Sequence, residues 1–81
     1  MKTNVHFYSY FKELAGCEKA MEATPAGSTL GDLHDQLTEK YPKLAAMKKS
    51  TLLAVGVEYQ PREYVLKDGD VVSLFPPVQG G

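Results

Sequence analysis

One amphipathic helix, surrounded by short strand-like segments, is the feature of this 81-residue sequence that most restricts its fold. Four apolar residues recur at helical spacing and predict a buried stripe: Leu30, Leu33, Leu37 and Tyr41. Thr29 and Asp32 are placed for a capping box at its start. Pro42 predicts its end, because proline disfavours helical geometry in the preceding residue. A chain this short has one thin core, so its strands must pack against this helix.

The remaining segments predict strands separated by turns. Strands are expected at residues 5–10, 18–23, 52–57 and 71–75, with a marginal strand at 64–66. In the first strand, Val5, Phe7 and Ser9 alternate with His6, Tyr8 and Tyr10, which predicts a buried face and a wetter one. We expect a helical turn over 11–16 that ends at Gly16, and turns over 58–62 and 67–70.

The resulting order, β-β-α-β-(short β)-β, predicts an α+β fold in which a mixed sheet packs on one main helix. If the first and last strands lie side by side and parallel, this is the ubiquitin-like β-grasp. We therefore expect residues 1–75 to form a β-grasp domain and residues 76–81 to form an extended C-terminal tail with Gly-Gly at its end.

Composition excludes several classes of function. The formal net charge is −1 and the basic residues form no single block, which argues against a nucleic-acid partner. The single cysteine, Cys17, excludes an internal disulfide and any multi-cysteine metal site. His6 and His34 have the spacing of surface or packing residues, so no metal site is expected. Without a long apolar run or a signal sequence, we expect a cytoplasmic protein that contacts no membrane.

The last six residues carry the clearest functional signal. Pro76 and Pro77 cannot join a ladder and favour a stiff, extended stalk. Gly80 and Gly81 have no side chains, so they can enter a narrow channel in another protein and present a carboxylate there. Taken alone, a terminal Gly-Gly is also compatible with an ordinary frayed end.

The whole sequence resembles the small subunits of molybdopterin synthase, which are ubiquitin-like sulfur carriers. Five segments carry the resemblance: Phe11–Gly16, Thr29–Leu30, Leu53–Val55, Leu66–Asp70 and Leu74–Gly81. The chain departs from the family pattern in two places. Gly56 stands where relatives commonly have Asn, and Gln79 stands where Ser, Thr or Ala is usual.

The resemblance implies that the C-terminal carboxylate of Gly81 is adenylated and then converted to a thiocarboxylate. Five residues would give the tail access to partner active sites: Gly80, Gln79, Val78, Pro77 and Pro76. The implied partners are an E1-like adenylating enzyme, a sulfur donor such as a cysteine desulfurase, and the large synthase subunit in a heterotetramer. ATP is used by the adenylating partner, and the chain binds no cofactor of its own. It would act as a non-catalytic small subunit and sulfur-donating co-substrate.

Docking requires a surface on the folded body. Family members present hydrophobic residues at the positions of Tyr8, Tyr59 and Phe75, so the resemblance implies that these three bind partners. If the first and last strands are neighbours, Tyr8 and Phe75 can touch on the outer face of the sheet. The alternative is that they are scattered surface aromatics, which are common.

Other functions stay open at this level. The sulfur could serve thiamine, a thiolated transfer RNA or an alternative metal cofactor such as a tungsten cofactor. Gly81 could instead be joined to a lysine, as in a protein modifier, or the domain could be a binding module that does not need its tail. Cys17 could carry sulfur as a persulfide, although a lone cysteine without a neighbouring histidine is more often structural.

Overall fold

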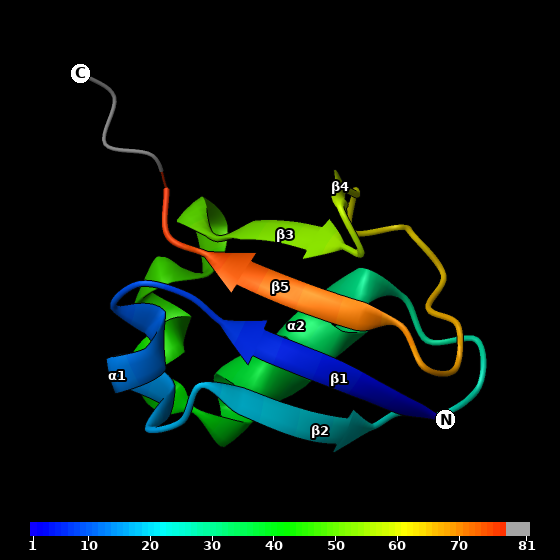
Figure 1. The fold of residues 1–81 in the computed structure, drawn as a ribbon, viewed down its shortest axis with the longest axis horizontal. Coiled ribbons are helices and arrows are strands. Elements are labelled where there is room, and N and C mark those ends of the chain that lie inside the picture. The colour runs from blue at the N-terminus through cyan, green and yellow to red at the C-terminus, as the bar shows by residue number, and fades with distance from the viewer. Residues whose placement is uncertain (78–81) are drawn as a thin grey trace.

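In the computed structural model, which describes residues 1–77, a five-stranded mixed sheet packs against one main helix (Figure 1). The strands are β1 (Lys2–Phe7), β2 (Lys19–Ala23), β3 (Leu52–Val55), β4 (Glu58–Tyr59) and β5 (Val71–Phe75). The helices are α1 (Phe11–Ala15), α2 (Leu30–Lys40) and the 3-10 helix η1 (Pro42–Ser50). None of these helices is both long enough and apolar enough to cross a membrane.

The strand order is β2-β1-β5-β3-β4, so the first and last strands of the chain are neighbours in the middle of the sheet. β1 and β5 run parallel, with Val5 opposite Val72 and Phe7 opposite Leu74. The β1–β2, β3–β5 and β3–β4 pairs are antiparallel. This topology confirms the predicted β-grasp, because a parallel central pair is what joins its two hairpins.

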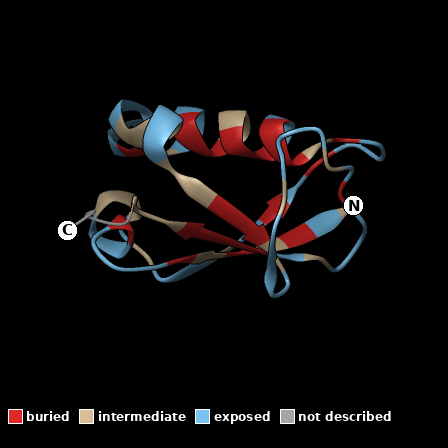
Figure 2. Ribbon diagram, turned by 90° about the horizontal axis from the view of Figure 1, so that it is seen from above, coloured by how far each residue is buried: buried red, intermediate tan, exposed pale blue. Residues whose placement is uncertain are grey.

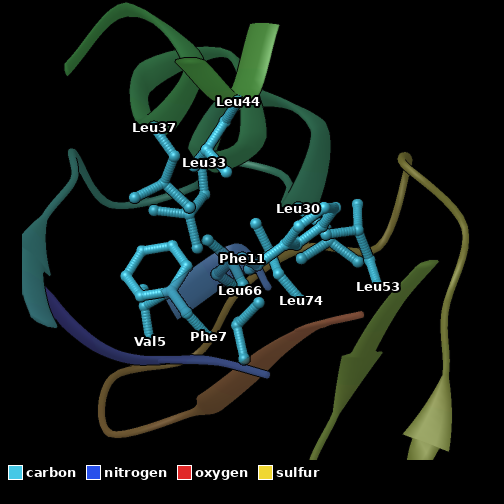
Figure 3. Close-up of a cluster of buried hydrophobic side chains, with 11 residues drawn as sticks. Val5, Phe7, Phe11, Leu30, Leu33, Leu37, Leu44, Leu53, Leu66 and Leu74 are labelled. Atoms are coloured by element: carbon cyan, nitrogen blue, oxygen red, sulfur yellow. The ribbon is translucent and has the colours of Figure 1, made fainter. Parts of the chain in front are cut away.

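The core lies between α2 and the inner face of the sheet, as the layer of buried residues in Figure 2 shows. The side chains of Leu30, Leu33 and Leu37 are fully buried, as the helical spacing predicted. They meet apolar side chains from the strands and from α1 (Figure 3). Tyr41 packs at the edge of this cluster, with its ring centroid 5.5 Å from that of Phe7.

The ends of α2 follow the predicted signals. Thr29 Oγ1 accepts a hydrogen bond from the backbone N–H of Asp32 at 3.1 Å, and Asp32 Oδ2 accepts one from Thr29 N–H at 3.0 Å. This reciprocal pair satisfies two N–H groups that the helix itself leaves unpaired. The helix ends at Lys40, immediately before Tyr41 and Pro42. The start and the end predicted from the sequence are therefore confirmed.

Two strands are shorter than the sequence predicted, one from its alternation and the other from its apolar run. β1 ends at Phe7, because Ser9 takes a positive φ of 56° and turns the chain into α1. β3 ends at Val55, because Gly56 takes a φ of 63° and begins a turn. The side chain of Val57, which the apolar run placed in the strand, is 99% exposed. In both cases the backbone turns before the hydrophobic pattern ends.

The short strand lies at residues 58–59, not at 64–66, and the predicted turn over 58–62 is wrong in its first two residues. The segment before Leu66 instead lies against the start of α2. The backbone of Tyr64 accepts a 2.7 Å hydrogen bond from Leu30 N–H, and Leu66 N–H donates to Ser28 O at 2.9 Å. Val65 makes only an isolated bridge, to Thr29. These bonds use the backbone groups that a sheet strand would need.

Candidate functional site

The root of the tail is fixed by the central strands. β5 ends at Phe75, and the backbone N–H of Tyr8 donates a 3.1 Å hydrogen bond to Leu74 O at this end. Pro76 and Pro77 follow without regular secondary structure. The remaining predicted tail residues lie outside the described residues: Val78, Gln79, Gly80 and Gly81. The chain therefore leaves the sheet from its middle strand, beside the end of β1.

Three aromatic side chains gather at this root, and we call Tyr8, Tyr59 and Phe75 the aromatic patch. The rings of Tyr8 and Phe75 are stacked, with centroids 4.7 Å apart and an interplanar angle of 14°. The Tyr59 ring meets Phe75 edge-on, at 6.4 Å and 72°. Tyr8 is 40% exposed and Tyr59 is 67% exposed. The predicted contact between Tyr8 and Phe75 is therefore present.

Strand pairing explains why these residues meet. Phe7 lies opposite Leu74 in the parallel pair, so the next residues, Tyr8 and Phe75, come side by side at the strand ends. Ala54 pairs with both Ser73 and Tyr59, which puts Tyr59 on the same face as Ser73 and Phe75. Because side chains alternate along a strand, this face is the one opposite the core.

Among residues 1–77, the helix α2 covers the inner face of the sheet, and no helix packs on the outer face (Figure 2). Ser73 and Ala54, which lie on this face, are only 6% exposed each. Exposed aromatic residues that cluster in this way are typical of protein–protein interfaces.

Two further apolar residues on this face were not predicted as site residues. Met21 on β2 and Val71 on β5 are exposed and lie opposite Asn4 on the two sides of β1. They lie toward the other end of the sheet, and His6 and Ser73 separate them from the aromatic patch. The alternation of residues in β2 and β5 could have predicted that both side chains point outward. It could not have predicted that they lie near each other, because that depends on how the strands pair.

Cys17 lies in the loop between α1 and β2 and is half-buried. Its Sγ lies 3.9 Å from Tyr41 Oη and 3.9 Å from Ala15 O. Burial, and then the neighbouring Cys17, raise the pKa of the Tyr41 hydroxyl. A phenol and a carbonyl offer a thiolate no positive charge, so these contacts do not form the environment of a reactive cysteine.

Among residues 1–77, no group of three His, Cys, Asp or Glu side chains is arranged to hold a metal ion. The aromatic patch itself contains no carboxylate, imidazole or thiol. Its chemistry is that of a binding surface next to the start of the tail.

Comparison with known proteins finds relatives that match nearly the whole chain. The profile of the ThiS family matches residues 5–81. The molybdopterin synthase sulfur carrier subunit of Mycobacterium tuberculosis is 34% identical over 88 aligned positions, which cover 100% of this chain and 99% of that protein.

Two solved structures have the same fold. A Pyrococcus furiosus protein assigned as subunit 1 of a molybdopterin converting factor superposes with a TM-score of 0.89 at 29% identity, over 96% of this chain and 99% of that one. In the complex of subunits 1 and 2 of the Helicobacter pylori molybdopterin-converting factor, one chain superposes with a TM-score of 0.73 at 29% identity, over 100% of both chains.

Proposed function

The chain belongs to the ThiS family, and from this membership we propose that it is a sulfur carrier of molybdopterin biosynthesis, loaded at the carboxylate of Gly81. The observation that carries the proposal is the match over residues 5–81, which includes both tail glycines. The resemblance to sulfur carrier subunits along their full length supports it. The aromatic patch beside the tail root supplies the surface on which a partner would hold the tail.

The proposed chemistry proceeds in two substitutions. A carboxylate oxygen of Gly81 attacks the α-phosphorus of ATP on an E1-like enzyme, and pyrophosphate leaves. The resulting acyl-adenylate has a better leaving group than a carboxylate, so hydrosulfide supplied through the donor can attack the carbonyl carbon and displace AMP. The product is a thiocarboxylate. ATP is bound by the adenylating partner, and this chain holds no cofactor; its own groups present the carboxylate and dock.

We further propose that the loaded carrier binds a large synthase subunit through the aromatic patch and donates its sulfur to the pyranopterin precursor. The complex of subunits 1 and 2 from Helicobacter pylori supports a partner of this kind. In the heterotetramer expected for such a synthase, each small subunit would insert residues 76–81 into a large subunit. Gly80 leaves room around the reacting carbonyl, because a side chain there would add bulk next to it.

The test is the intact mass of the chain after incubation with ATP, a cognate adenylating enzyme and a sulfur donor. The expected result is the replacement of one oxygen by sulfur, mapped by fragmentation to Gly81. The Cys17→Ser variant should be loaded equally well, whereas removal of Gly81 should prevent loading.

The same experiment separates the alternatives. Sulfur that disappears with Cys17→Ser would favour the persulfide. ATP-dependent adducts on lysines of other proteins, lost with Gly81, would identify a protein modifier. A chain that is loaded but does not convert the pyranopterin precursor with any large subunit would belong to another sulfur pathway.

A further inference from the structure

A hollow of about 410 Å³ lies on the side of the molecule where α2, η1 and the start of β3 meet. Six residues line it: His34, Lys48, Lys49, Thr51, Leu53 and Arg62. We call it the basic hollow. It is separate from the aromatic patch, because Leu53 points into the core side of the sheet while its neighbour Leu52 pairs with Phe75. Nothing in the proposed carrier chemistry uses these residues.

The hollow carries more positive than negative charge. Lys48 Nζ lies 2.5 Å from Asp35 Oδ1, and Arg62 Nη2 lies 3.0 Å from the same oxygen. The carboxylate of Asp35 therefore forms ion pairs with two cations. Within residues 1–77, Lys49 forms no ion pair with an acidic residue. Lys48 and Arg62 also retain N–H groups beyond those bound to Asp35, since an ammonium has three donors and a guanidinium five.

His34 forms a buried part of the wall of the hollow. Its side chain is 2% exposed, and Arg62 Nη1 lies 3.4 Å from His34 Nδ1. Because a guanidinium can only donate, this contact favours the tautomer in which Nδ1 accepts and Nε2 carries the ring proton. Nε2 has no hydrogen-bond partner among the described residues. Nε2 is itself inaccessible, so it offers no donor to a ligand in the hollow, and the contribution of His34 is its contact with Arg62.

We propose that the basic hollow binds the phosphate group of a small molecule, with Lys48, Lys49 and Arg62 supplying positive charge and hydrogen-bond donors. A phosphate carries close to two negative charges at neutral pH, which balances three cations and one carboxylate. Its oxygens accept several hydrogen bonds at once, as donors from separate elements require. A metal cation is disfavoured by the same charges.

The inferred ligand is either inorganic phosphate or an organic monophosphate. Leu53 and the ring of His34 give part of the wall an apolar character. The hollow is also larger than a phosphate group alone requires. An organic group attached to the phosphate would therefore have a surface to contact, and a comparison of the two ligands separates them.

The test is a nuclear magnetic resonance titration of the full ¹⁵N-labelled chain at neutral pH and constant ionic strength, with sodium phosphate, AMP and adenosine. The proposal expects saturable shifts at the amides of the residues lining the hollow with both phosphates and none with adenosine. Tighter binding of AMP would identify an organic monophosphate, and equal binding would identify inorganic phosphate. Loss of the lone, exposed charge in Lys49→Ala should weaken binding about two- to five-fold.

Lys43→Ala is the matched control, because Lys43 is an exposed lysine of the same helix η1 but does not line the hollow. It should leave the affinity unchanged. Equal weakening by both variants, or shifts that sodium chloride reproduces, would show diffuse attraction to a basic surface and overturn the proposal.

Discussion

Acid should destabilise this protein through His34 well before its carboxylates titrate. Burial first, and then the positive charges of Arg62 and Lys48, lower the pKa of His34 from 6.5 to about 4 against an opposing effect of Asp35. In the unfolded chain the imidazole regains its ordinary pKa. The unfolded state therefore binds a proton at a higher pH than the folded state does, and stability is lost as the pH falls from 6.5 toward 4.

The magnitude follows from these two pKa values. Between pH 7 and pH 5 the unfolded chain becomes almost fully protonated at this site while the folded chain stays neutral, which costs about 2 kcal/mol of unfolding free energy. That is a large share of the total for a domain of this size, for which about 5 kcal/mol is typical. Carboxylates with ordinary pKa values remain mostly ionised in this range, so they contribute little to the slope.

Urea denaturation at pH 7, 6 and 5 measures this slope. His34→Gln should flatten it, because the amide does not titrate, even if the variant is less stable at every pH. His6→Gln, a substitution on the outer face of the sheet, keeps His34 and should keep the slope of the parent chain. If His34→Gln lost stability with pH as steeply as the parent, the reasoning would be refuted. Direct titration of the His34 ring in the folded chain gives the same answer without a variant.

Three further predictions concern the helix, the core and the docking surface. Thr29→Ala removes the reciprocal cap with Asp32 and should lower the free energy of unfolding by about 1 kcal/mol in urea denaturation. Leu33→Ala, at a fully buried position, should cost about 3 kcal/mol, whereas Val57→Ala at a fully exposed apolar position should stay within about 0.5 kcal/mol. Phe75→Ala should weaken binding to a large synthase subunit about thirty-fold in calorimetry, through loss of the central ring of the aromatic patch.

The sequence predicts this fold well wherever one local signal decides the structure. The helix α2 is bounded by a capping box and by Pro42, and neither depends on the rest of the chain. The positive φ of 85° at Gly69 is similarly dictated by a turn sequence. The contact between Tyr8 and Phe75 could also be predicted, because the parallel pairing of the first and last strands follows from the topology.

The sequence does not predict elements whose structure depends on which distant backbone groups form hydrogen bonds with each other, or elements without an amphipathic pattern. Val65 belongs to a segment with strand-like residues. Its neighbours Tyr64 and Leu66, however, form backbone hydrogen bonds with residues at the start of α2 instead of with a sheet strand. The helix η1 has a single buried residue, Leu44, so it has no amphipathic pattern to reveal it. The basic hollow is assembled from residues of α2, η1 and β3 that lie far apart in the sequence, so no local pattern could reveal it.

The aromatic patch and the basic hollow lie on opposite sides of β3, which predicts how far they influence each other. Leu52 faces the patch and pairs with Phe75, while the adjacent Leu53 faces the hollow. The sheet backbone thus separates the two sites, and no side chain belongs to both. The effects of Phe75→Ala and Lys49→Ala on binding to a large subunit should therefore add within about 0.5 kcal/mol in a double-mutant cycle. A larger coupling energy would mean that β3 transmits changes from the hollow to the docking surface, so that a bound phosphate could regulate the carrier.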